Sequence, residues 1–430
     1  MGCEPRSDPT GRDPTAVIDL RQLREDPEYR AGIKRKRVAP GLIGEVLALD
    51  DEERAQRRTV EAVRAEQKAV SKEIARDPAG RDAKLAEASS LKDQVQQAEQ
   101  ELGVLERRLR DLALQLPNPA DPTVPDGGED DGEVLRTIGD PGPAPSRDHA
   151  AFADAMRFVE TRHAAESSGS RFASLLGEAV LVDLALVNWT MARLAAEGFT
   201  PVIPPVLVRE AAMEEAGFFP TDRAQVYDVD RGALYLVGTS EIPLSTLHRG
   251  ERLDPSALPA RYAGLSTCFR REAGTHGKDT SGIFRVHQFD KVEMFSYTDP
   301  DQSDEEHERI LSIQESLIGA LGLPYRVVNI AAGDLGAAAA KKYDLEVWLP
   351  SEGRYRELTS SSNYRDFSAR RLGTRVKSDQ GTRLVHTLNG TGCAVGRTLV
   401  FLWEHYQRDD TTFDVPDVLR PYCGFDSVSR

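Results

Sequence analysis

The stretch that decides the fold is CFRREAGTHGKDTSGIFRVHQFDKVEMF, residues 268–295. Two strand-like ends flank a glycine-rich middle, which predicts two neighbouring strands joined by a loop. Arg270 and Glu272 are two residues apart on the first end, so a strand would point both to one face. Arg285 and Glu293 lie on the second end. Burying two arginines and two carboxylates in one sheet requires a charged ligand or mutual pairing, and a surface ladder of ion pairs is the alternative.

A second glycine-rich junction follows near the end of the chain, in TLNGTGCAVGRTLVFLWEHYQ (387–407). It predicts a strand that runs through the glycines into a helix, with Arg397 near the helix start. A helix N-terminus beside an arginine stabilises a phosphate group. Because glycine-rich junctions between a strand and a helix are common, this motif alone is a weak indication of phosphate binding.

Hydroxyl and carboxylate groups gather in two other segments. Glu357 and Ser360 lie in RELTSSSNYRDFSARR, after the strand-like run YDLEVWLP, and offer the oxygen ligands that magnesium prefers. A turn rich in serine explains the same residues without a metal. Thr239 and Glu241 follow an apolar strand in LVGTSEIPL. Each of these segments is ambiguous when it is taken by itself.

Composition restricts the class of protein. The 430 residues contain 55 Lys+Arg and 70 Asp+Glu, for a net charge of −15, and 40% of them are hydrophobic. These values fit a large catalytic domain with a smaller one, and they exclude a wholly disordered chain. No apolar run is long enough to predict a membrane span. The four dispersed cysteines indicate neither a zinc site nor a disulfide framework, so a cytoplasmic location is expected.

The N-terminal region divides into a tail and a helical hairpin. Residues 1–16 have no apolar signal core and are expected to be a disordered tail. Residues 17–116 form the predicted N-terminal domain. Within it, the apolar positions of 44–76 and 83–116 are spaced three and four residues apart, as in coiled coils. The DPAGRD segment between them contains Pro and Gly, which end a helix, so an antiparallel hairpin is predicted.

Charge sets this hairpin apart from the rest of the chain. Between residues 30 and 111 there are 18 Lys+Arg and 16 Asp+Glu, whereas the remainder is strongly acidic. A slightly basic arm on an acidic body would attract a polyanion. An exposed hairpin also needs charges of both signs to stay soluble. Composition leaves both explanations open.

The remainder of the chain predicts an α+β domain. Residues 117–147 are rich in Pro, Gly and Asp and are expected to form a linker. Residues 148–430 contain strands and helices in blocks, which favours an antiparallel β-sheet flanked by helices. An amphipathic helix is predicted at 175–197, a strand within 199–208, and a short helix at the alanines of 337–340.

Together these segments resemble seryl-tRNA synthetases of the bacterial type, which are class II aminoacyl-tRNA synthetases. The resemblance is carried by the runs FRREAG…HQFDKVE, YDLEVW, SNYRDFSARR and TLNGTGCAVGRTL, which follow one another in the family's order. It covers nearly all of the chain after residue 16. It implies a class II catalytic domain at 148–430 and a tRNA-binding domain at 17–116. It also implies a two-step reaction, in which serine and ATP form seryl-adenylate and pyrophosphate, and serine is then transferred to the 3′ end of tRNA(Ser).

The resemblance assigns an ATP and Mg²⁺ site. Arg270 would bridge the α-phosphate and the serine carboxylate, and Arg397 would hold the γ-phosphate with help from Arg285. Glu272 would accept a hydrogen bond from the adenine amino group, and Phe289 would stack on the ring. The ATP-binding residues that the resemblance implies are Arg270, Glu272, Arg285, Phe289, Arg397 and, as magnesium ligands, Glu357 and Ser360.

The same resemblance assigns a serine pocket. A site that hydrogen-bonds the serine hydroxyl rejects alanine, because its own polar atoms would otherwise be left unpaired. Threonine must be excluded by a lack of room for its methyl group. The serine-binding residues that the resemblance implies are Thr239, Glu241, Arg270, Glu293, Asn389 and Thr391.

The family's partners follow from the same comparison. In such enzymes the coiled-coil arm binds the long variable arm of tRNA(Ser). This favours the explanation that the basic hairpin attracts a polyanion over the explanation that its charges serve only solubility. The helix at 175–197 and the strand that holds Pro204 and Pro205 match the segment that builds a homodimer. The arm residues that are candidates for tRNA binding are Arg54, Arg57, Arg58, Arg64, Lys68, Lys72 and Arg76.

Some residues depart from the family pattern. Ser281 replaces an arginine in the glycine-rich loop, and Cys393 and Trp403 lie close to the final motif. A seryl-tRNA synthetase for translation is the leading hypothesis. A competent paralogue that supplies a biosynthetic pathway or resists a serine-mimicking inhibitor stays open.

Two other relatives are disfavoured. An inert RNA-binding scaffold is expected to have lost the key side chains, but Arg270, Glu357 and Arg397 are all present. Carrier-protein aminoacylating relatives lack this arm and use a zinc ligand set, which the four dispersed cysteines do not provide.

Overall fold

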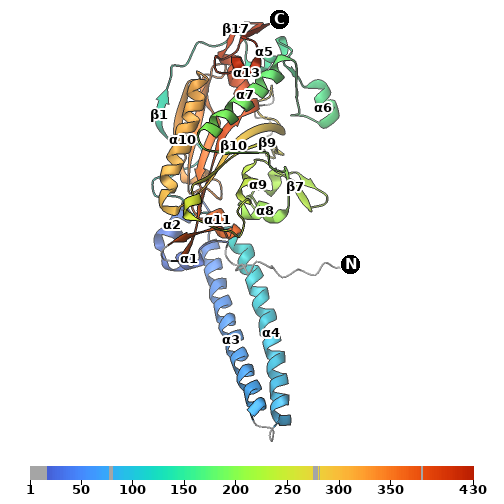
Figure 1. Cartoon of the computed structure of the whole chain (residues 1–430), viewed down its shortest axis with the longest axis vertical. Helices are drawn as coiled ribbons and strands as arrows, with labels where there is room; N and C mark the ends of the chain where they lie inside the picture. The colour runs from blue at the N-terminus through green and yellow to red at the C-terminus, as the bar shows by residue number, and fades with distance from the viewer. Residues whose placement is uncertain (1–16, 77–80, 275–278, 280, 379–380) are drawn as a thin grey trace. The chain divides into compact units, whose positions relative to one another are not determined.

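The computed structural model describes the chain except for residues 1–16, 77–80, 275–278, 280 and 379–380 (Figure 1). The predicted tail and the predicted reversal between the two long helices therefore lie outside the described residues. The chain divides into two compact units, Met1–Pro119 and Ala120–Arg430. Each unit is described by itself.

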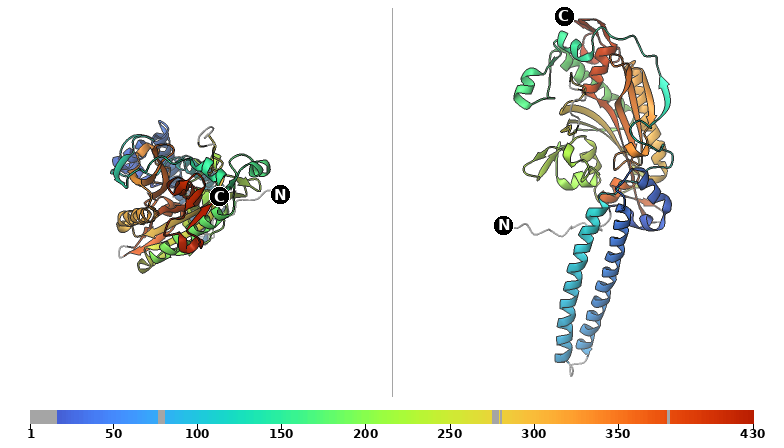
Figure 2. Two further views of the ribbon diagram at one scale, coloured as in Figure 1. Left: turned by 90° about the horizontal axis from the view of Figure 1, so that it is seen from above. Right: turned by 180° about the vertical axis from the view of Figure 1, so that it is seen from behind.

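The first unit is helical. Its helices are α1 (Leu20–Glu25), α2 (Pro27–Arg35), α3 (Leu42–Arg76) and α4 (Arg81–Ala113). The two long helices run side by side in Figures 1 and 2, which confirms the predicted helical arm. At about 1.5 Å per residue, each limb is about 50 Å long.

The seam between α3 and α4 explains the spacing of the apolar residues. Val60, Val70, Leu91 and Val95 are buried along it. Glu53 is also buried in this seam, and Arg57 compensates its charge by donating a hydrogen bond of 2.9 Å to Glu53 Oε1. Polar interruptions of the seam are therefore satisfied by partners.

The second unit is built on an eight-stranded sheet with the order β1-β11-β12-β13-β16-β10-β9-β4. All neighbouring strands are antiparallel except β4 and β9, which are parallel. The α+β class with an antiparallel sheet is thus confirmed. The strands are β1 (Glu133–Ile138), β4 (Thr200–Val202), β9 (Ala260–Phe269), β10 (Gln288–Thr298), β11 (Tyr325–Asn329), β12 (Lys341–Leu349), β13 (Arg354–Asn363) and β16 (His386–Ala394).

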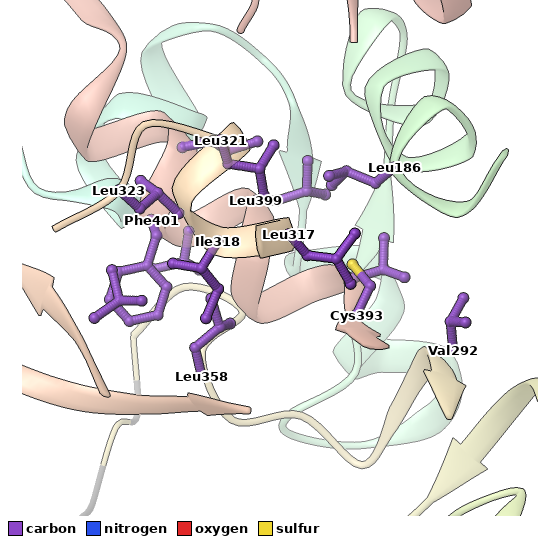
Figure 3. Packing of buried hydrophobic residues seen from close by; sticks show 14 of the residues in the cluster. Leu186, Val292, Leu317, Ile318, Leu321, Leu323, Leu358, Cys393, Leu399 and Phe401 are labelled. Carbon is purple, nitrogen blue, oxygen red and sulfur yellow. The ribbon is translucent and has the colours of Figure 1, made fainter. Parts of the chain in front are cut away.

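Three helices cover one face of this sheet: α7 (Glu178–Ala196), α10 (Ser303–Ala320) and α12 (Val395–His405). Figure 3 shows the core between them, with Leu186 of α7, Leu317 of α10 and Leu399 of α12 directed toward one another. Among the described helices, α7 is the one that is long and apolar enough to cross a membrane by length and composition. Its place in this core accounts for the same apolar character.

Smaller elements complete the second unit. The helices are α5 (His149–Ala155), α6 (Arg162–Ser168), α8 (Glu210–Glu215), α9 (Glu241–Ser245), α11 (Phe367–Leu372) and α13 (Arg420–Cys423). The strands are β2 (Val159–Glu160), β3 (Ser174–Leu175), β5 (Leu207–Val208), β6 (Asp228–Val229), β7 (Leu234–Leu236), β8 (Arg252–Leu253), β14 (Arg375–Ser378), β15 (Gly381–Leu384), β17 (Gln407–Asp409), β18 (Thr412–Asp414) and β19 (Ser427–Ser429).

Several segments differ from the sequence-based expectation. The strand expected to hold Pro204 and Pro205 is divided into β4 and β5, and the two prolines lie between them. The range 117–147, expected as a linker, contains β1, which pairs with β11 at the edge of the sheet. The helix predicted at 337–340 is absent. Four alanines are too few to nucleate a helix, and the backbone N–H of Ala340 instead donates to Asn363 O, at 2.8 Å.

Candidate active site

A cavity of about 410 Å³ lies in the second unit. All twelve residues that the sequence assigned to ATP or serine binding line it: Thr239, Glu241, Arg270, Glu272, Arg285, Phe289, Glu293, Glu357, Ser360, Asn389, Thr391 and Arg397. The structure therefore brings together side chains that are separated by up to 158 positions in the sequence. A surface ladder of ion pairs, the alternative for the first motif, is wrong, because Glu293 is completely buried.

The centre of the sheet supplies one wall of the cavity. Phe289, Lys291 and Glu293 alternate along β10, so their side chains reach the same face. Asn389 and Thr391 do the same on β16. These two strands pair antiparallel, which places the two sets beside each other.

Glu357 and Ser360 line the cavity from β13 although they are three residues apart, a spacing that would normally put them on opposite faces. A β-bulge resolves the conflict. Leu345 of β12 pairs with Thr359 and the next residue, Glu346, pairs with Glu357, so Leu358 has no partner on β12. Leu358 is instead buried in the core shown in Figure 3.

The opposite face of the sheet is tightly packed behind these residues. A Cβ at Gly390 would approach Ile310 of α10 to 2.4 Å, so only glycine allows the helix this close. Gln314 of α10 donates hydrogen bonds to the backbone oxygens of Ser360, at 2.8 Å, and Thr391, at 3.0 Å. The helix thereby fixes the two strands that carry the cavity wall.

Arg270 and Glu272 lie beyond the end of β9 rather than within a strand. Glu272 has a φ of 48°, a left-handed conformation that costs energy for a residue other than glycine. This turn directs its carboxylate to Arg285, whose Nη1 donates to Glu272 Oε2 at 2.6 Å. Arg270 Nε donates to Gly238 O at 3.2 Å, and its guanidinium lies 5.4 Å from the Phe289 ring centroid.

One end of the cavity concentrates positive charge. Arg397, at the start of α12, lies 5.2 Å from the Phe284 ring centroid and donates to Glu357 O at 3.2 Å. Burial lowers the pKa of the Arg397 guanidinium, and repulsion from Arg270 and Arg285 lowers it further, against the attraction of Glu357. A polyanion bound between these arginines would relieve that repulsion.

The Glu357 carboxylate fits a divalent cation. Desolvation opposes its ionisation, but the positive charges of Lys342 and Arg397 outweigh that effect and hold its pKa below the ordinary value. Its side chain is 45% exposed, and its oxygen stands 3.8 Å from Arg397, so the carboxylate retains room for a ligand. With the Ser360 hydroxyl it forms an all-oxygen donor pair of the kind that Mg²⁺ prefers, and phosphate and water oxygens would supply the other ligands. The described residues contain no cluster of three or more His, Cys, Asp or Glu suited to a metal.

The other end of the cavity concentrates buried carboxylates. Asn389 Nδ2 donates to Glu241 Oε2 at 3.0 Å and to Glu293 Oε1 at 2.9 Å. Lys291 Nζ lies 2.8 Å from Glu293 Oε2, and Thr391 Oγ1 lies 3.4 Å from the same atom. Burial, followed by repulsion from Glu293, raises the pKa of Glu241 to about 7.

Sequence reasoning missed several residues of the cavity. Lys291 and Lys342 carry buried charge into it, and Phe284 lies beneath Arg397. The spacing of Lys291 and Glu293 in a predicted strand could have revealed that the two side chains share a face. Nothing in the sequence indicated that Phe284 faces the cavity.

The departures from the family pattern lie elsewhere. Cys393 is buried beside Thr398 at 3.5 Å, and burial raises the pKa of its thiol to about 11. Trp403 packs against Phe158 with the ring centroids 5.9 Å apart. These residues belong to the core, and neither they nor Ser281 line the cavity.

The basic residues predicted to bind tRNA fall into two groups. Arg57 and Arg64 form ion pairs across the hairpin, with Glu106 at 3.0 Å and Glu99 at 2.6 Å. Arg58, Lys68 and Lys72 are exposed and have no ion pair within the part of the chain that the structure describes. Arg54 is exposed beside Asp51. The side chain of Arg76 lies outside the described residues.

The antiparallel sheet and its arginine-lined cavity agree with a class II tRNA synthetase core, the class that the sequence models identify. The sequence model described as tRNA synthetase class II core domain (G, H, P, S and T) matches residues 225–406. The model described as seryl-tRNA synthetase N-terminal domain matches residues 17–120.

Individual relatives narrow this class. The serine–tRNA ligase of Acidothermus cellulolyticus is 46% identical over 95% of this chain and 99% of its own length. That of Streptomyces coelicolor is 45% identical over 95% of this chain and 98% of its own length. The crystal structure of seryl-tRNA synthetase from Pyrococcus horikoshii complexed with ATP has a TM-score of 0.89 and 37% identity, covering 96% of this chain and 99% of that one. The chain belongs to the seryl-tRNA synthetase family, and its activity is that of a serine–tRNA ligase.

Proposed function

We propose that the cavity holds serine and ATP side by side, with the arginine-rich end on the triphosphate and the carboxylate-rich end on serine. The observation that carries this proposal is the joint lining of one cavity by the twelve residues named above. The two ends complement the two substrates, since ATP brings negative charge and the serine amino group brings positive charge.

The first step joins serine to AMP. A serine carboxylate oxygen attacks the α-phosphorus, the bond from this phosphorus to the bridging oxygen breaks, and pyrophosphate leaves. Both partners are anionic, so the protein must position them and offset their repulsion. Arg270 is proposed to contact the serine carboxylate and the α-phosphate, and Arg397 and Arg285 the outer phosphates. A protein general base is unnecessary, because the serine carboxylate is already ionised.

The adenine site needs a local exchange of partners. Glu272 accepts from Arg285 in this structure, and Phe289 lies beside the Arg270 guanidinium. Adenine is proposed to enter with its amino group donating to Glu272 and its ring on Phe289. Arg285 is then available to the phosphates.

Glu357 and Ser360 are proposed to hold Mg²⁺. Their all-oxygen chemistry and the open carboxylate of Glu357 support this assignment. When bound, the ion would supply positive charge to the triphosphate. The residues around it orient the phosphates through fixed guanidinium forks, which lysine cannot copy.

The second step delivers serine to tRNA(Ser), which the helical arm is proposed to bind. Arg54, Arg58, Lys68 and Lys72 fall within a sector of roughly 80° on the side of α3 away from the buried seam. Phosphates would attract these exposed cations. Arg57 and Arg64, which are paired across the hairpin, are instead proposed to hold the register of its two helices.

A homodimer is proposed through α7. Leu181 and Leu184 on its outer side are 46% and 52% exposed, and Ile203 is 82% exposed. Leu176 and Leu207 are also exposed apolar residues of these segments. Apolar side chains at this density favour burial against a second copy.

A role in translation, in the cytoplasm, is favoured over a paralogue for a separate pathway. Cys393 and Ser281, which depart from the family pattern, do not line the cavity. The test is ATP–pyrophosphate exchange with serine, threonine, alanine and glycine, followed by charging of tRNA(Ser) with the full chain and after deletion of residues 50–112. Exchange specific for serine, with charging lost on deletion, is expected. Exchange without charging by the full chain would contradict the translational role.

A further inference from the structure

Lys291 is a buried cation of the cavity that has no role in the proposal above. Its Nζ lies 2.8 Å from Glu293 Oε2, and its side chain is 8% exposed. The two residues are two positions apart on β10 and share a face. Burying an ammonium costs several kcal/mol unless it is paired, so Lys291 is held in place by the Glu293 charge.

The cavity contains two buried carboxylates. Lys291 pairs directly with Glu293 and attracts the charge of Glu241 without a direct ion pair. Glu241 and Glu293 both accept from Asn389 Nδ2. Glu293 also has the Lys291 ammonium and the Thr391 hydroxyl at its second oxygen. Glu241 accepts a hydrogen bond from the neutral hydroxyl of Tyr364. Glu293 therefore has a cation in direct contact, whereas Lys291 and Arg270 attract the Glu241 charge only without a direct ion pair and do not hold its pKa at the ordinary value.

This asymmetry decides how an amino acid can lie in the pocket. An uncompensated carboxylate attracts an ammonium in preference to a hydroxyl, because the charge–charge attraction is stronger. If Glu293 were uncompensated, it would compete for the amino group, which serine and alanine share. A compensated carboxylate still has lone pairs to accept from a hydroxyl, which only serine supplies.

We propose that Lys291 is a specificity-determining positioning residue: by compensating Glu293 it directs the amino group of the substrate to Glu241 and reserves Glu293 for the serine hydroxyl. The inference rests on the proposed serine site. It assigns the discrimination against alanine to a side chain that touches Glu293 rather than to substrate contacts alone. Burial and repulsion from Glu293 raise the pKa of Glu241 to about 7 although Lys291 and Arg270 act in the opposite direction, so a substrate ammonium beside Glu241 would favour its ionised form.

The test measures kcat/KM in pyrophosphate exchange for serine and for alanine in the full-length chain. Lys291→Met, which keeps the length and removes the charge, is expected to lower the serine-to-alanine ratio at least about tenfold, with the KM for ATP unchanged. Lys291→Arg, which keeps the charge, is expected to retain the ratio within about threefold. The matched control is Lys342→Met, which removes another buried ammonium of the cavity, paired with Asp344 at 3.0 Å. Lys342→Met is expected to lower kcat/KM for serine and kcat/KM for alanine by the same factor.

Two results would overturn the proposal. An equal fall for serine and alanine in Lys291→Met would mean that Lys291 only supports the structure. If Lys291→Arg lowered the serine-to-alanine ratio as much as Lys291→Met does, the charge of Lys291 would not be the cause of the discrimination. Thermal stabilisation by ATP shows whether Lys291→Met is folded. If ATP does not raise its melting temperature, Lys291→Gln is measured instead, with the same expected fall in the serine-to-alanine ratio. A wild-type chain without serine exchange would instead contradict the proposed function itself.

Discussion

Charged residues of the cavity and of the helical arm share one chemistry but differ in surroundings. In the cavity Glu241, Glu293 and Lys291 are buried, and each depends on a few fixed partners. On the arm, Arg57 and Arg64 are 46% and 60% exposed, and water can replace any partner they lose. Buried charges should therefore be individually indispensable, whereas exposed ones should act in number and weaken with salt.

The largest effect is expected at the phosphate end of the cavity. Arg270→Ala should reduce pyrophosphate exchange at least about 10³-fold, because the variant loses the positive charge that is proposed to lie between the serine carboxylate and the α-phosphate. Arg270→Lys should not restore the rate, since an ammonium lacks the guanidinium fork. Exchange by Arg270→Ala at the parental rate would refute the proposed role.

A smaller effect is expected at the serine end. Glu293→Gln keeps the shape of the side chain but removes its charge, so it should lower kcat/KM for serine about 10²-fold. The KM for ATP should stay within about twofold. A comparable rise in the KM for ATP would show that the two ends of the cavity are not separate sites.

The carboxylates of the serine end should also make binding depend on pH. The pKa of Glu241 is raised to about 7, so its carboxyl takes up a proton below that pH in the empty pocket. An amino group binds the ionised form, so the KM for serine should rise as the pH falls, by about tenfold between pH 8 and pH 6. The charged and titratable groups that face Glu241 are Glu293, Lys291, Arg270 and Tyr364. A KM for serine that is constant from pH 8 to pH 6 would contradict the assignment.

On the arm, paired substitutions should have a moderate, salt-dependent effect. Arg58→Ala combined with Lys72→Ala should raise the KM for tRNA(Ser) about fivefold. The slope of log affinity against log salt concentration should fall by the amount expected for the loss of about two phosphate contacts. Exchange without tRNA should be unchanged. Arg107→Ala, at an exposed position of α4, is the control and should leave the KM for tRNA unaltered.

The smallest effect is expected for Arg64, whose ion pair across the hairpin is exposed on both sides. Arg64→Ala should lower the free energy of unfolding of the arm by at most about 1 kcal/mol, because its ion pair with Glu99 is exposed. Thermal unfolding measures this change, and the KM for tRNA should stay constant. A large rise in that KM would place Arg64 among the tRNA contacts.

The sequence predicted the arm and the sheet well because their patterns are periodic. The seam of α3 and α4 follows a spacing of 3.5 residues, and β10 alternates as a strand should. It also identified the twelve cavity residues through their motifs. Local patterns did not reveal β1, because six residues in a Pro-rich segment gain their structure from pairing with β11.

Other features depend on contacts between distant segments. The alanine run at 337–340 predicts a helix by its composition, but the backbone N–H of Ala340 donates to Asn363 in the neighbouring strand instead. The bulge at Leu358 is visible only in the register of β12 and β13. Arg57 and Arg64 differ from the other arm cations because they form ion pairs across the hairpin. These pairs can be predicted only when it is known which residues of α4 lie opposite.

The absence of a side chain at Gly390 has a consequence for changing what the enzyme accepts. Residues 389 and 391 are the obvious places to redesign the pocket, yet their positions depend on a helix that touches the back of the same strand. Even one methyl group at 390 would clash with Ile310, so either α10 or the strand that carries residues 389 and 391 would have to shift. A side chain at position 390 would therefore require a residue smaller than Ile310 on α10.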